Sequence, residues 1–352
     1  APELREYQAE AVEIMMSSHR GLINMVTGLG KTLTAVHLIR KMKKRALVVC
    51  PSVAIAENFF DELSKYFGSN KVGMFGGGKK QIKDITVGIV ASVNNHVEKF
   101  VQHDLGLVIT DECHHCPAET FFNIGKHLGH VGRMFGLTAT DYRSDGKDVL
   151  ITASVGEVLI KRDIVWGINN KWLADPVFLI KHVNTSGREF PNDKLKNYKE
   201  HVMSSKVMNE QIISDIQKFL QAGKKVLCLV DLVAHGEMIS KAVGLPFACG
   251  EDKNSNEYIK QLNSGKIQGL IGTDSKIGEG CDTRLVDVLI LANFPASKGP
   301  LMQNIGRGLR LYPGKTSLII RDYCPDGSKM LKRHCQNRIK LYKEITNSVK
   351  EV

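Results

Sequence analysis

Two kinds of segment alternate along the whole chain: short apolar runs, and longer stretches with apolar residues at helical spacing. In the first half, apolar runs predict strands at residues 22–26, 46–50, 72–75, 86–91, 107–110 and 134–137. Residues 34–43 and 55–67 carry their apolar positions on one face and predict helices. Buried strands that alternate with helices are typical of a parallel sheet covered by helices on both faces.

The second half repeats this alternation after a break. Residues 161–176, with Trp166 and Trp172, and the polar residues 184–188 fit neither pattern. We therefore predict a first domain at 1–165, a junction at 166–195 and a second domain at 196–352. We expect the two tryptophans to pack at the junction, with base stacking as the alternative. In the second domain the pattern predicts strands at 226–230, 247–249, 268–272, 286–292 and 317–322. It predicts helices at 198–221, 234–243, 255–262 and 301–309, and a basic helix at 328–349.

Composition narrows the class of protein. The chain has 352 residues, 43% of them hydrophobic and 24% charged, which is typical of globular domains. It contains neither a signal-peptide pattern nor an apolar run long enough to span a bilayer, so we expect a cytosolic protein with no membrane partner. The formal charge of +11 favours a polyanionic partner, most simply nucleic acid. The chain begins with Ala1-Pro2, which leaves open a processed end or a missing N-terminal domain.

The cysteines are scattered, and several lie in apolar, strand-like runs, which is typical of reduced, buried thiols. The run Cys113-His114-His115-Cys116 offers metal-binding side chains. Neighbouring side chains on one short segment rarely complete a tetrahedron, and no second Cys/His pair has finger-like spacing. We therefore expect no zinc site there.

A glycine-containing loop lies between the first strand and the following helix. Its sequence is Thr27-Gly28-Leu29-Gly30-Lys31-Thr32. Glycines let several backbone N–H groups face one anion at the positive end of a helix. Lys31 would add a charge for the β- and γ-phosphates, and the Thr32 hydroxyl a ligand for Mg²⁺. Met25 stands where the P-loop pattern has its first glycine, so the loop alone is an incomplete match.

Two adjacent carboxylates, Asp111 and Glu112, follow the apolar run at 107–110. In a P-loop ATPase one carboxylate at this place holds Mg²⁺ through its water, and the next acts on the attacking water. An isolated Asp-Glu pair would more often be a solvated loop. Its place directly after a buried strand favours a functional site.

Several motifs in this order resemble those of superfamily 2 helicases, and the resemblance covers nearly the whole chain. The motifs are Leu4-Arg5-Glu6-Tyr7-Gln8, the phosphate loop, Asp111-Glu112-Cys113-His114, Gly136-Leu137-Thr138-Ala139-Thr140, residues 271–282 and residues 303–310. Asn304 stands where the DEAD-box branch has arginine. The run Arg143-Ser144-Asp145-Gly146, two residues after the Thr-Ala-Thr motif, looks more like the DNA-translocating branch, which includes transcription-repair helicases, restriction-enzyme motor subunits and phage branched-DNA helicases. The small size fits the phage-type recombination helicases best.

The resemblance implies two RecA-like parallel-sheet α/β domains in tandem, with an ATP cleft between them. It implies that Arg5, Tyr7 and Gln8 bind the base, and that residues 27–32, from Thr27 through Gly28, Leu29, Gly30 and Lys31 to Thr32, hold the phosphates of ATP. Thr32 and Asp111 would hold Mg²⁺, partly through water, and Glu112 would act on water. Gly280 and Asp282 would sense the nucleotide, and Gln303, Arg307 and Arg310 would complete the site. Arg307 and Arg310 are expected one helical turn apart, pointing at one cleft.

Further residues are implied to contact DNA or to couple it to ATP. Pro51, Ser52, Ser92 and Thr273 each follow a predicted strand and resemble the family's phosphate-gripping segments. For each serine the alternative is a simple helix N-cap. His114, Thr138 and Thr140 would couple the ATP site to the DNA. The glycine-rich basic segment at 76–80 is either a phosphate contact or a solvated hairpin.

The function that the resemblance implies is that of an ATP-dependent DNA helicase or translocase. We expect a monomeric motor that acts on branched, forked or duplex DNA without sequence specificity, in recombination, repair or replication. An RNA helicase, or a nucleic-acid-stimulated ATPase switch that does not unwind, is the alternative.

Overall fold

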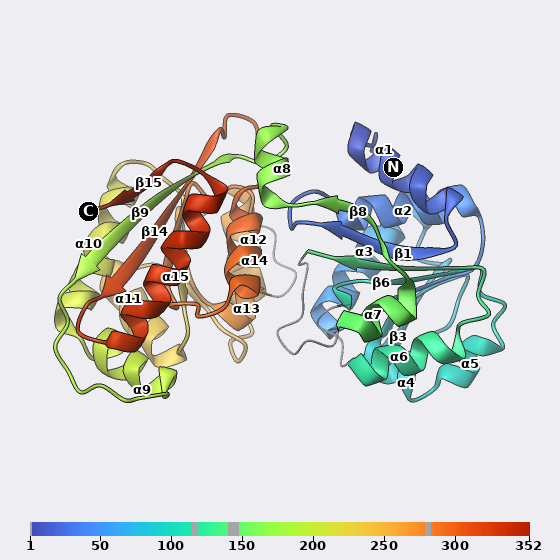
Figure 1. Cartoon of the computed structure of the whole chain (residues 1–352), viewed down its shortest axis with the longest axis horizontal. Coiled ribbons are helices and arrows are strands. Elements are labelled where there is room, and N and C mark those ends of the chain that lie inside the picture. Colours follow the sequence, from blue (N-terminus) through green and yellow to red (C-terminus); the bar gives the residue numbers. More distant parts are fainter. Residues whose placement is uncertain (1, 114–117, 140–147, 279–282) are drawn as a thin grey trace. The chain divides into compact units, whose positions relative to one another are not determined.

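The computed structural model describes residues 2–113, 118–139, 148–278 and 283–352. The chain forms two compact units, Ala1–Asp163 and Ile164–Val352. Figure 1 shows that each unit consists of a sheet with helices packed on it. Each unit is described by itself below.

The first unit is built on an eight-stranded sheet with the order β4-β3-β5-β2-β6-β7-β1-β8. Its strands are β1 (Arg20–Met25), β2 (Ala46–Cys50), β3 (Val72–Gly76), β4 (Lys79–Lys80), β5 (Ile85–Ile89), β6 (Leu107–Thr110), β7 (Arg133–Thr138) and β8 (Val158–Arg162). The pairs are parallel except β3 with β4, which is antiparallel. The segment 76–80 therefore forms a hairpin at the edge of the sheet. Strands β2, β3, β5 and β6 are buried at every position, because helices cover both faces.

In the first unit, helix α1 precedes β1 and the other helices lie between strands. They are α1 (Glu6–Ser17), α2 (Lys31–Met42), α3 (Val53–Phe67), α4 (Val90–Asn94), α5 (Val97–Val101), α6 (Ala118–His127) and α7 (Asp148–Val155). Helix α1 packs on α2, and α6 packs on α7. A buried apolar cluster that includes Leu47, Phe75, Phe100 and Met134 joins the sheet to the helices. This core fixes the strand ends from which the candidate site is built.

The second unit has a seven-stranded sheet with the order β11-β12-β10-β13-β14-β9-β15, and its strand pairs are parallel. The strands are β9 (Asp175–Val183), β10 (Val226–Val230), β11 (Phe247–Ala248), β12 (Gly269–Thr273), β13 (Val288–Ala292), β14 (Ser317–Pro325) and β15 (Val349–Glu351). The helices are α8 (Ile164–Asn169), α9 (Lys194–Tyr198), the π-helical turn η2 (Lys199–Met203), α10 (Lys206–Gln221), α11 (Val233–Val243), α12 (Ser255–Ser264), α13 (Asp274–Gly278), α14 (Lys298–Gly308) and α15 (Lys329–Ile345). Two parallel sheets in an α/β arrangement are the fold class that the sequence predicted.

Three elements of the second unit differ from the sequence-based expectation. The segment expected as a junction contributes β9, which pairs with β14 over its whole length and with β15 on its other side. The expected helix at 198–221 is divided, because the Ser205 hydroxyl accepts a hydrogen bond from the Met208 amide at 3.4 Å and starts α10 as an N-cap. The basic C-terminal helix ends at Ile345, and residues 349–351 form β15 instead.

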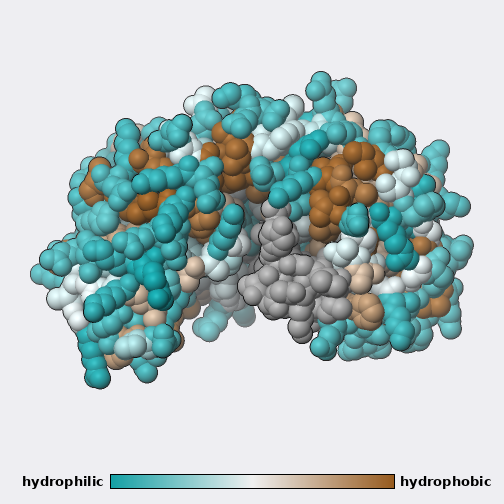
Figure 2. Space-filling view, viewed as in Figure 1, coloured by the Kyte–Doolittle hydropathy of each residue, from teal (hydrophilic) through white to brown (hydrophobic). Residues whose placement is uncertain are grey.

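The face in Figure 2 is mostly hydrophilic, with smaller hydrophobic areas over both units. Among the described residues, no helix is long and apolar enough to cross a membrane. The described cysteines are buried and form no disulfide bond: Cys50, Cys113, Cys228, Cys249, Cys324 and Cys335.

Candidate active site

The phosphate loop leaves the sheet at the carboxyl end of β1 and enters α2. Gly28 and Gly30 have φ angles of 101° and 83°, a left-handed backbone that favours glycine. A Cβ on Gly30 would lie 2.3 Å from the Nε2 atom of Gln8, so any side chain there would require Gln8 to shift. Leu29 between them is fully buried. The two glycines and the buried Leu29 side chain therefore fix the backbone conformation of the loop.

The start of α1 holds this loop from outside. The Tyr7 hydroxyl and the Gln8 amide nitrogen each donate a hydrogen bond to the Leu29 carbonyl oxygen at 2.9 Å. The Gln8 amide oxygen accepts from the Arg5 backbone N–H at 3.0 Å, and the Arg5 guanidinium donates to the Tyr7 hydroxyl at 3.2 Å. The fold thus brings Arg5, Tyr7 and Gln8 to the loop, although these residues precede Leu29 by more than twenty positions in the sequence.

Lys31 links the loop to the two carboxylates. Its side chain is buried, and its Nζ atom donates to the Met25 carbonyl oxygen at 3.0 Å. The same atom lies 3.4 Å from Oε1 of Glu112. The carboxylates reach this place because β6, which precedes them, is separated from β1 by β7 alone. The Asp111 amide also donates to the Val49 carbonyl oxygen at 2.8 Å, which ties the segment to β2.

Asp111 is the most strongly perturbed group of this site. Its pKa is raised from 3.8 to about 7, first because burial removes the carboxylate from water and second because Glu112 is negative. The positive charge of Lys31 offsets only part of this effect. Within the described structure, the Asp111 Oδ1 atom and the Thr27 hydroxyl are buried without a hydrogen-bond partner. A buried carboxylate oxygen that lacks a donor is chemically suited to a hard cation such as Mg²⁺.

Glu112 has a strained backbone, which sequence reasoning did not detect. Its φ angle is 44°, in the left-handed region that residues other than glycine adopt at a cost of about 1 kcal/mol or more. Its side chain is buried, with the carboxylate aimed at Lys31. Strain of this kind is concentrated at functional sites, where the surrounding structure holds a residue in an unfavourable conformation.

The structure places the remaining first-unit candidates at strand ends or helix starts. Thr138 is the buried last residue of β7, in register with Asn24 of β1. Ser52 is the N-cap of α3, and its hydroxyl accepts from the Ile55 amide at 3.4 Å, so the capping alternative is observed. Ser92 lies inside α4 rather than before it, because β5 already ends at Ile89. Pro51 precedes Ser52 at the end of β2 and is partly buried.

In the second unit, the expected arginine pair has a different geometry. Helix α14 ends at Gly308, so Arg307 is helical whereas Arg310 lies beyond the helix, in an isolated antiparallel bridge with Leu173. The two residues are not one helical turn apart. Gln303 precedes Arg307 by one turn on α14, and Thr273 ends β12 with a buried side chain. His114, Thr140, Gly280 and Asp282 lie outside the described residues.

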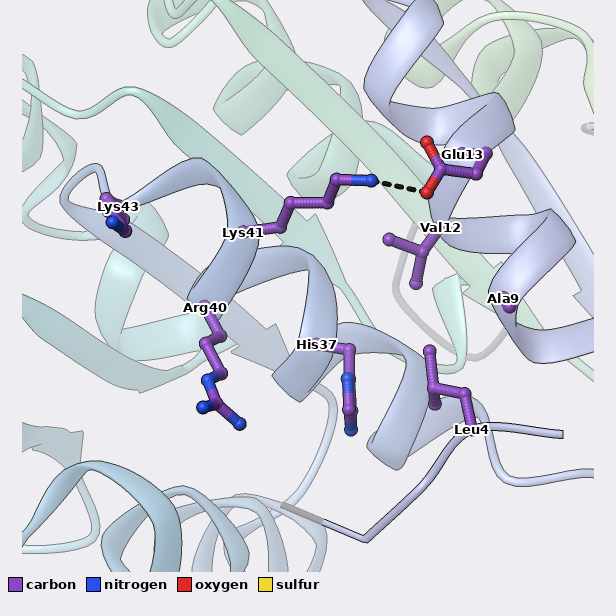
Figure 3. Close-up of a pocket in the computed structure, with 8 residues that line it drawn as sticks. All are labelled: Leu4, Ala9, Val12, Glu13, His37, Arg40, Lys41 and Lys43. Atoms are coloured by element: carbon purple, nitrogen blue, oxygen red, sulfur yellow. Dashed lines mark hydrogen bonds and ion pairs between the residues drawn. The ribbon is translucent and has the colours of Figure 1, made fainter.

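A surface groove lies on the first unit beside this site but shares none of its predicted residues. It has a volume of about 400 Å³ and is lined by side chains from α1 and α2 and from the residues that flank them. Figure 3 shows His37, Arg40 and Lys41 on α2 on one side of the groove, with the Lys41 ammonium directed at the Glu13 carboxylate of α1. The groove reflects the packing of two amphipathic helices rather than a phosphate site, because none of the loop residues lines it.

Comparisons with known proteins agree with this arrangement. Residues 1–143 match the family model of the Type III restriction enzyme res subunit. The chain is 30% identical to the DNA 3'-5' translocase XPB2 of Sulfurisphaera tokodaii over 224 residues, which are 63% of this chain and 50% of that protein. It is 27% identical to the probable helicase D10 of Escherichia phage T5 over 341 residues, which are 92% of this chain and 71% of that protein.

Solved structures show the same fold. The fragment structure of a putative HsdR subunit of a type I restriction enzyme from Vibrio vulnificus matches with a TM-score of 0.70 and 20% identity, over 99% of this chain and 68% of that chain. S. cerevisiae Dbp5 bound to RNA matches with a TM-score of 0.69 and 11% identity, over 99% of this chain and 89% of that chain. The chain spans about half the length of the first curated relatives, at 50%, 53% and 50%. In its ordered motifs, its fold and these relatives, the chain resembles the superfamily 2 helicases.

Proposed function

We propose that this protein couples ATP hydrolysis to movement along branched or duplex DNA. The observation that carries the proposal is the buried group of Lys31, Asp111 and Glu112 at the carboxyl ends of β1 and β6. Ligands of open parallel sheets bind at this edge. Burying carboxylates beside a phosphate loop costs folding free energy, and a bound cation with its phosphate group would offset that cost.

The phosphates of ATP are bound by the loop in this proposal. Gly28 and Gly30 allow the backbone N–H groups to converge on an anion at the start of α2, where the helix dipole is positive. The Lys31 ammonium adds its charge for the β- and γ-phosphates. Arg5, Tyr7 and Gln8 bind the base, and the bonds of Tyr7 and Gln8 to Leu29 connect base recognition to the phosphate loop.

Mg²⁺ fits the oxygen atoms that the loop and the carboxylates supply. Thr32 and Asp111 would hold the ion, partly through water, and the ion would neutralise charge on the β- and γ-phosphate oxygens. The raised pKa of Asp111 supports this role, because a nearby dication favours the ionised carboxylate that burial disfavours. Glu112 orients the attacking water, with Lys31 holding its carboxylate.

Residues of the second unit complete the chemistry in this proposal. Gln303, Arg307 and Arg310 stabilise the charge of the transferred phosphoryl group, for which a guanidinium is suited. Gly280 and Asp282 sense the nucleotide. His114, Thr138 and Thr140 couple hydrolysis to the DNA.

DNA is bound through its phosphates. Pro51, Ser52, Ser92 and Thr273 supply hydroxyl and backbone contacts, which position a strand without reading its sequence. The net charge of +11 supports a polyanionic partner. The relatives, a DNA 3'-5' translocase and a phage helicase among them, favour DNA over RNA. We further propose that the motor works as a monomer in recombination, repair or replication.

The test compares Lys31→Ala with Lys41→Ala. Both lysines lie on α2, but Lys41 pairs with Glu13 on the surface and not with the carboxylates. Steady-state ATP turnover is measured with single-stranded, forked, four-way and duplex DNA and with RNA. We expect Lys31→Ala to lose DNA-stimulated turnover and Lys41→Ala to keep it. Parental turnover in a folded Lys31→Ala protein would contradict the phosphate-loop assignment, and stimulation by RNA alone would contradict the DNA substrate.

A further inference from the structure

One group of metal-binding side chains gathers in the second unit, and none of them belongs to the ATP-site motifs. The ligand atoms of His182, Cys324 and Asp326 lie within 4.8 Å of one another, a combination found at this one place among the described residues. The group is formed by two paired strands, β9 and β14, and the residue that follows β14. Neither the sequence motifs nor the proposed helicase function uses these residues.

The strand register explains why the three side chains meet. His182 of β9 is the direct partner of Cys324 of β14 in the parallel pair. Asp326 follows Cys324 by two residues, the spacing at which side chains return to the same face of a strand. The Asp326 backbone N–H donates to the Val183 carbonyl oxygen at 2.9 Å, which keeps this residue in line with the sheet. The three ligands are therefore fixed by backbone pairing rather than by a loop.

We propose that His182, Cys324 and Asp326 form a zinc-binding site, with water in the fourth position. Imidazole nitrogen, thiolate sulfur and carboxylate oxygen are the three ligand types that Zn²⁺ accepts, at about 2.0 to 2.3 Å from the ion. Ligands at these distances in a tetrahedron are roughly 3.3 to 3.6 Å apart. The Nδ1 atom of His182 lies 3.4 Å from Oδ2 of Asp326. One thiolate and one carboxylate also balance the double charge of the ion.

Neighbouring groups orient the ligands as metal sites require. The other ring nitrogen of His182, Nε2, lies 3.2 Å from a carboxylate oxygen of Glu351 on β15. A carboxylate that accepts from the far nitrogen fixes the imidazole tautomer and leaves Nδ1 as the ligand. The Lys332 ammonium binds Oδ1 of Asp326 at 3.0 Å, and both oxygens of this carboxylate lie near Nδ1 of His182, Oδ2 at 3.4 Å and Oδ1 at 3.5 Å. Glu351 and Lys332 thus help to hold the two ligand residues in place.

The site has a buried side and an open side. Cys324 is fully buried against α15, whose Cys335 thiol hydrogen-bonds to its sulfur. The side chains of His182 and Asp326 are 39% and 28% exposed, so an ion can enter from solvent. A bound ion would join β14 to β9 and, through Glu351, to β15. It would hold together the edge of the sheet that carries the last strand of the chain.

Titration of the reduced full-length chain with Co²⁺, a spectroscopic substitute for Zn²⁺, tests the site. We expect one ion per chain, thiolate-to-cobalt charge-transfer absorption, the visible bands of a four-coordinate ion, and displacement by Zn²⁺. Cys324→Ser should remove the charge-transfer band, and Glu351→Gln should weaken binding about 10- to 100-fold. Cys249→Ser, a buried cysteine elsewhere in this unit, should change nothing.

Other outcomes would overturn the site. One is the absence of saturable cobalt binding with a thiolate signature. Another is a signal that survives Cys324→Ser but disappears in Cys116→Ser, which would assign the ion to the Cys113-His114-His115-Cys116 run. Because a buried cysteine can be needed for folding, the partly exposed His182→Gln is the second variant, and its circular dichroism must match the parent. Zn²⁺ should also raise the melting temperature seen by the fluorescence of Trp166 and Trp172, which lie in this unit, and His182→Gln should abolish that rise.

Discussion

The raised pKa of Asp111 makes the stability of the first unit depend on pH in a specific direction. The carboxyl has a pKa of about 7 in the folded chain and 3.8 as its ordinary value. Folding therefore favours the protonated form, and as pH rises from about 4 to about 7 the unfolded chain releases this proton before the folded chain does. The group destabilises the fold by about 2 kcal/mol near pH 5 and about 4 kcal/mol near pH 8, in the absence of a metal ion.

Asp111→Asn removes the charge and keeps the size of the side chain. The unfolding free energy of the variant should exceed that of the parent, and this excess should grow by about 2 to 3 kcal/mol as the pH rises from about 5 to about 8. Asp61→Asn is the matched control, because Asp61 is an exposed carboxylate on α3. Asp61→Asn should change the unfolding free energy only slightly, and by the same amount at both pH values.

The assay uses urea unfolding with a chelator and without nucleotide. Far-ultraviolet circular dichroism follows both units, whereas tryptophan fluorescence follows the second unit alone, because both tryptophans of the chain, Trp166 and Trp172, lie in it. The difference between the two curves isolates the first unit. A gain from Asp111→Asn that is the same at both pH values would refute the raised pKa, and with it the electrostatic argument for Mg²⁺ at this carboxylate.

Three further outcomes can be measured. Gly30→Ala should lower the unfolding free energy of the first unit more than Gly78→Ala does. Both glycines have φ near 80° (83° and 82°), but only at Gly30 would the added Cβ meet Gln8. Equal losses would show that the contact with Gln8 is relieved without cost. Arg338→Leu should destabilise the second unit by about 3 to 5 kcal/mol, because it leaves the fully buried Asp322 carboxylate without its 2.8 Å partner; a loss below about 1 kcal/mol would contradict this. DNA affinity should fall with salt by a log–log slope of roughly 0.7 to 0.9 per neutralised phosphate, and a salt-insensitive affinity would argue against backbone binding.

The sequence predicts best those strands that are buried on both faces along their whole length. Strands β2, β6 and β10 are buried on both faces, so their apolar runs mark their bounds without ambiguity. Strand β9 was missed because its burial alternates and its second residue is Pro176. Strand β15 contains Lys350 and Glu351 and forms only because β9 offers a free edge, which is a tertiary effect that local sequence does not carry.

The candidate site shows the same division. The loop, Asp111 and Glu112 are identifiable from sequence, because glycines and paired carboxylates after apolar strands have specific physical reasons. The contact of Gly30 with Gln8 and the left-handed backbone of Glu112 are not, since both depend on distant segments meeting. Most of the second unit separates His182 from Cys324 and Asp326 in the sequence, so no local spacing could have indicated that the three residues meet.

The position of β9 in its sheet has a consequence for how the protein is made. Both neighbours of this strand, β14 and β15, come later in the chain, and its pairing partner for Asp175 is Ser317. At a synthesis rate of about 5 to 20 residues per second, β9 waits on the order of ten seconds before β14 exists. During that interval the apolar face of β9, with Phe178 and Ile180, has no strand beside it. The first unit can fold while the ribosome is still working, but the sheet of the second unit is complete only after β14 and β15 have been made, and its nascent form is the stage most in need of a chaperone.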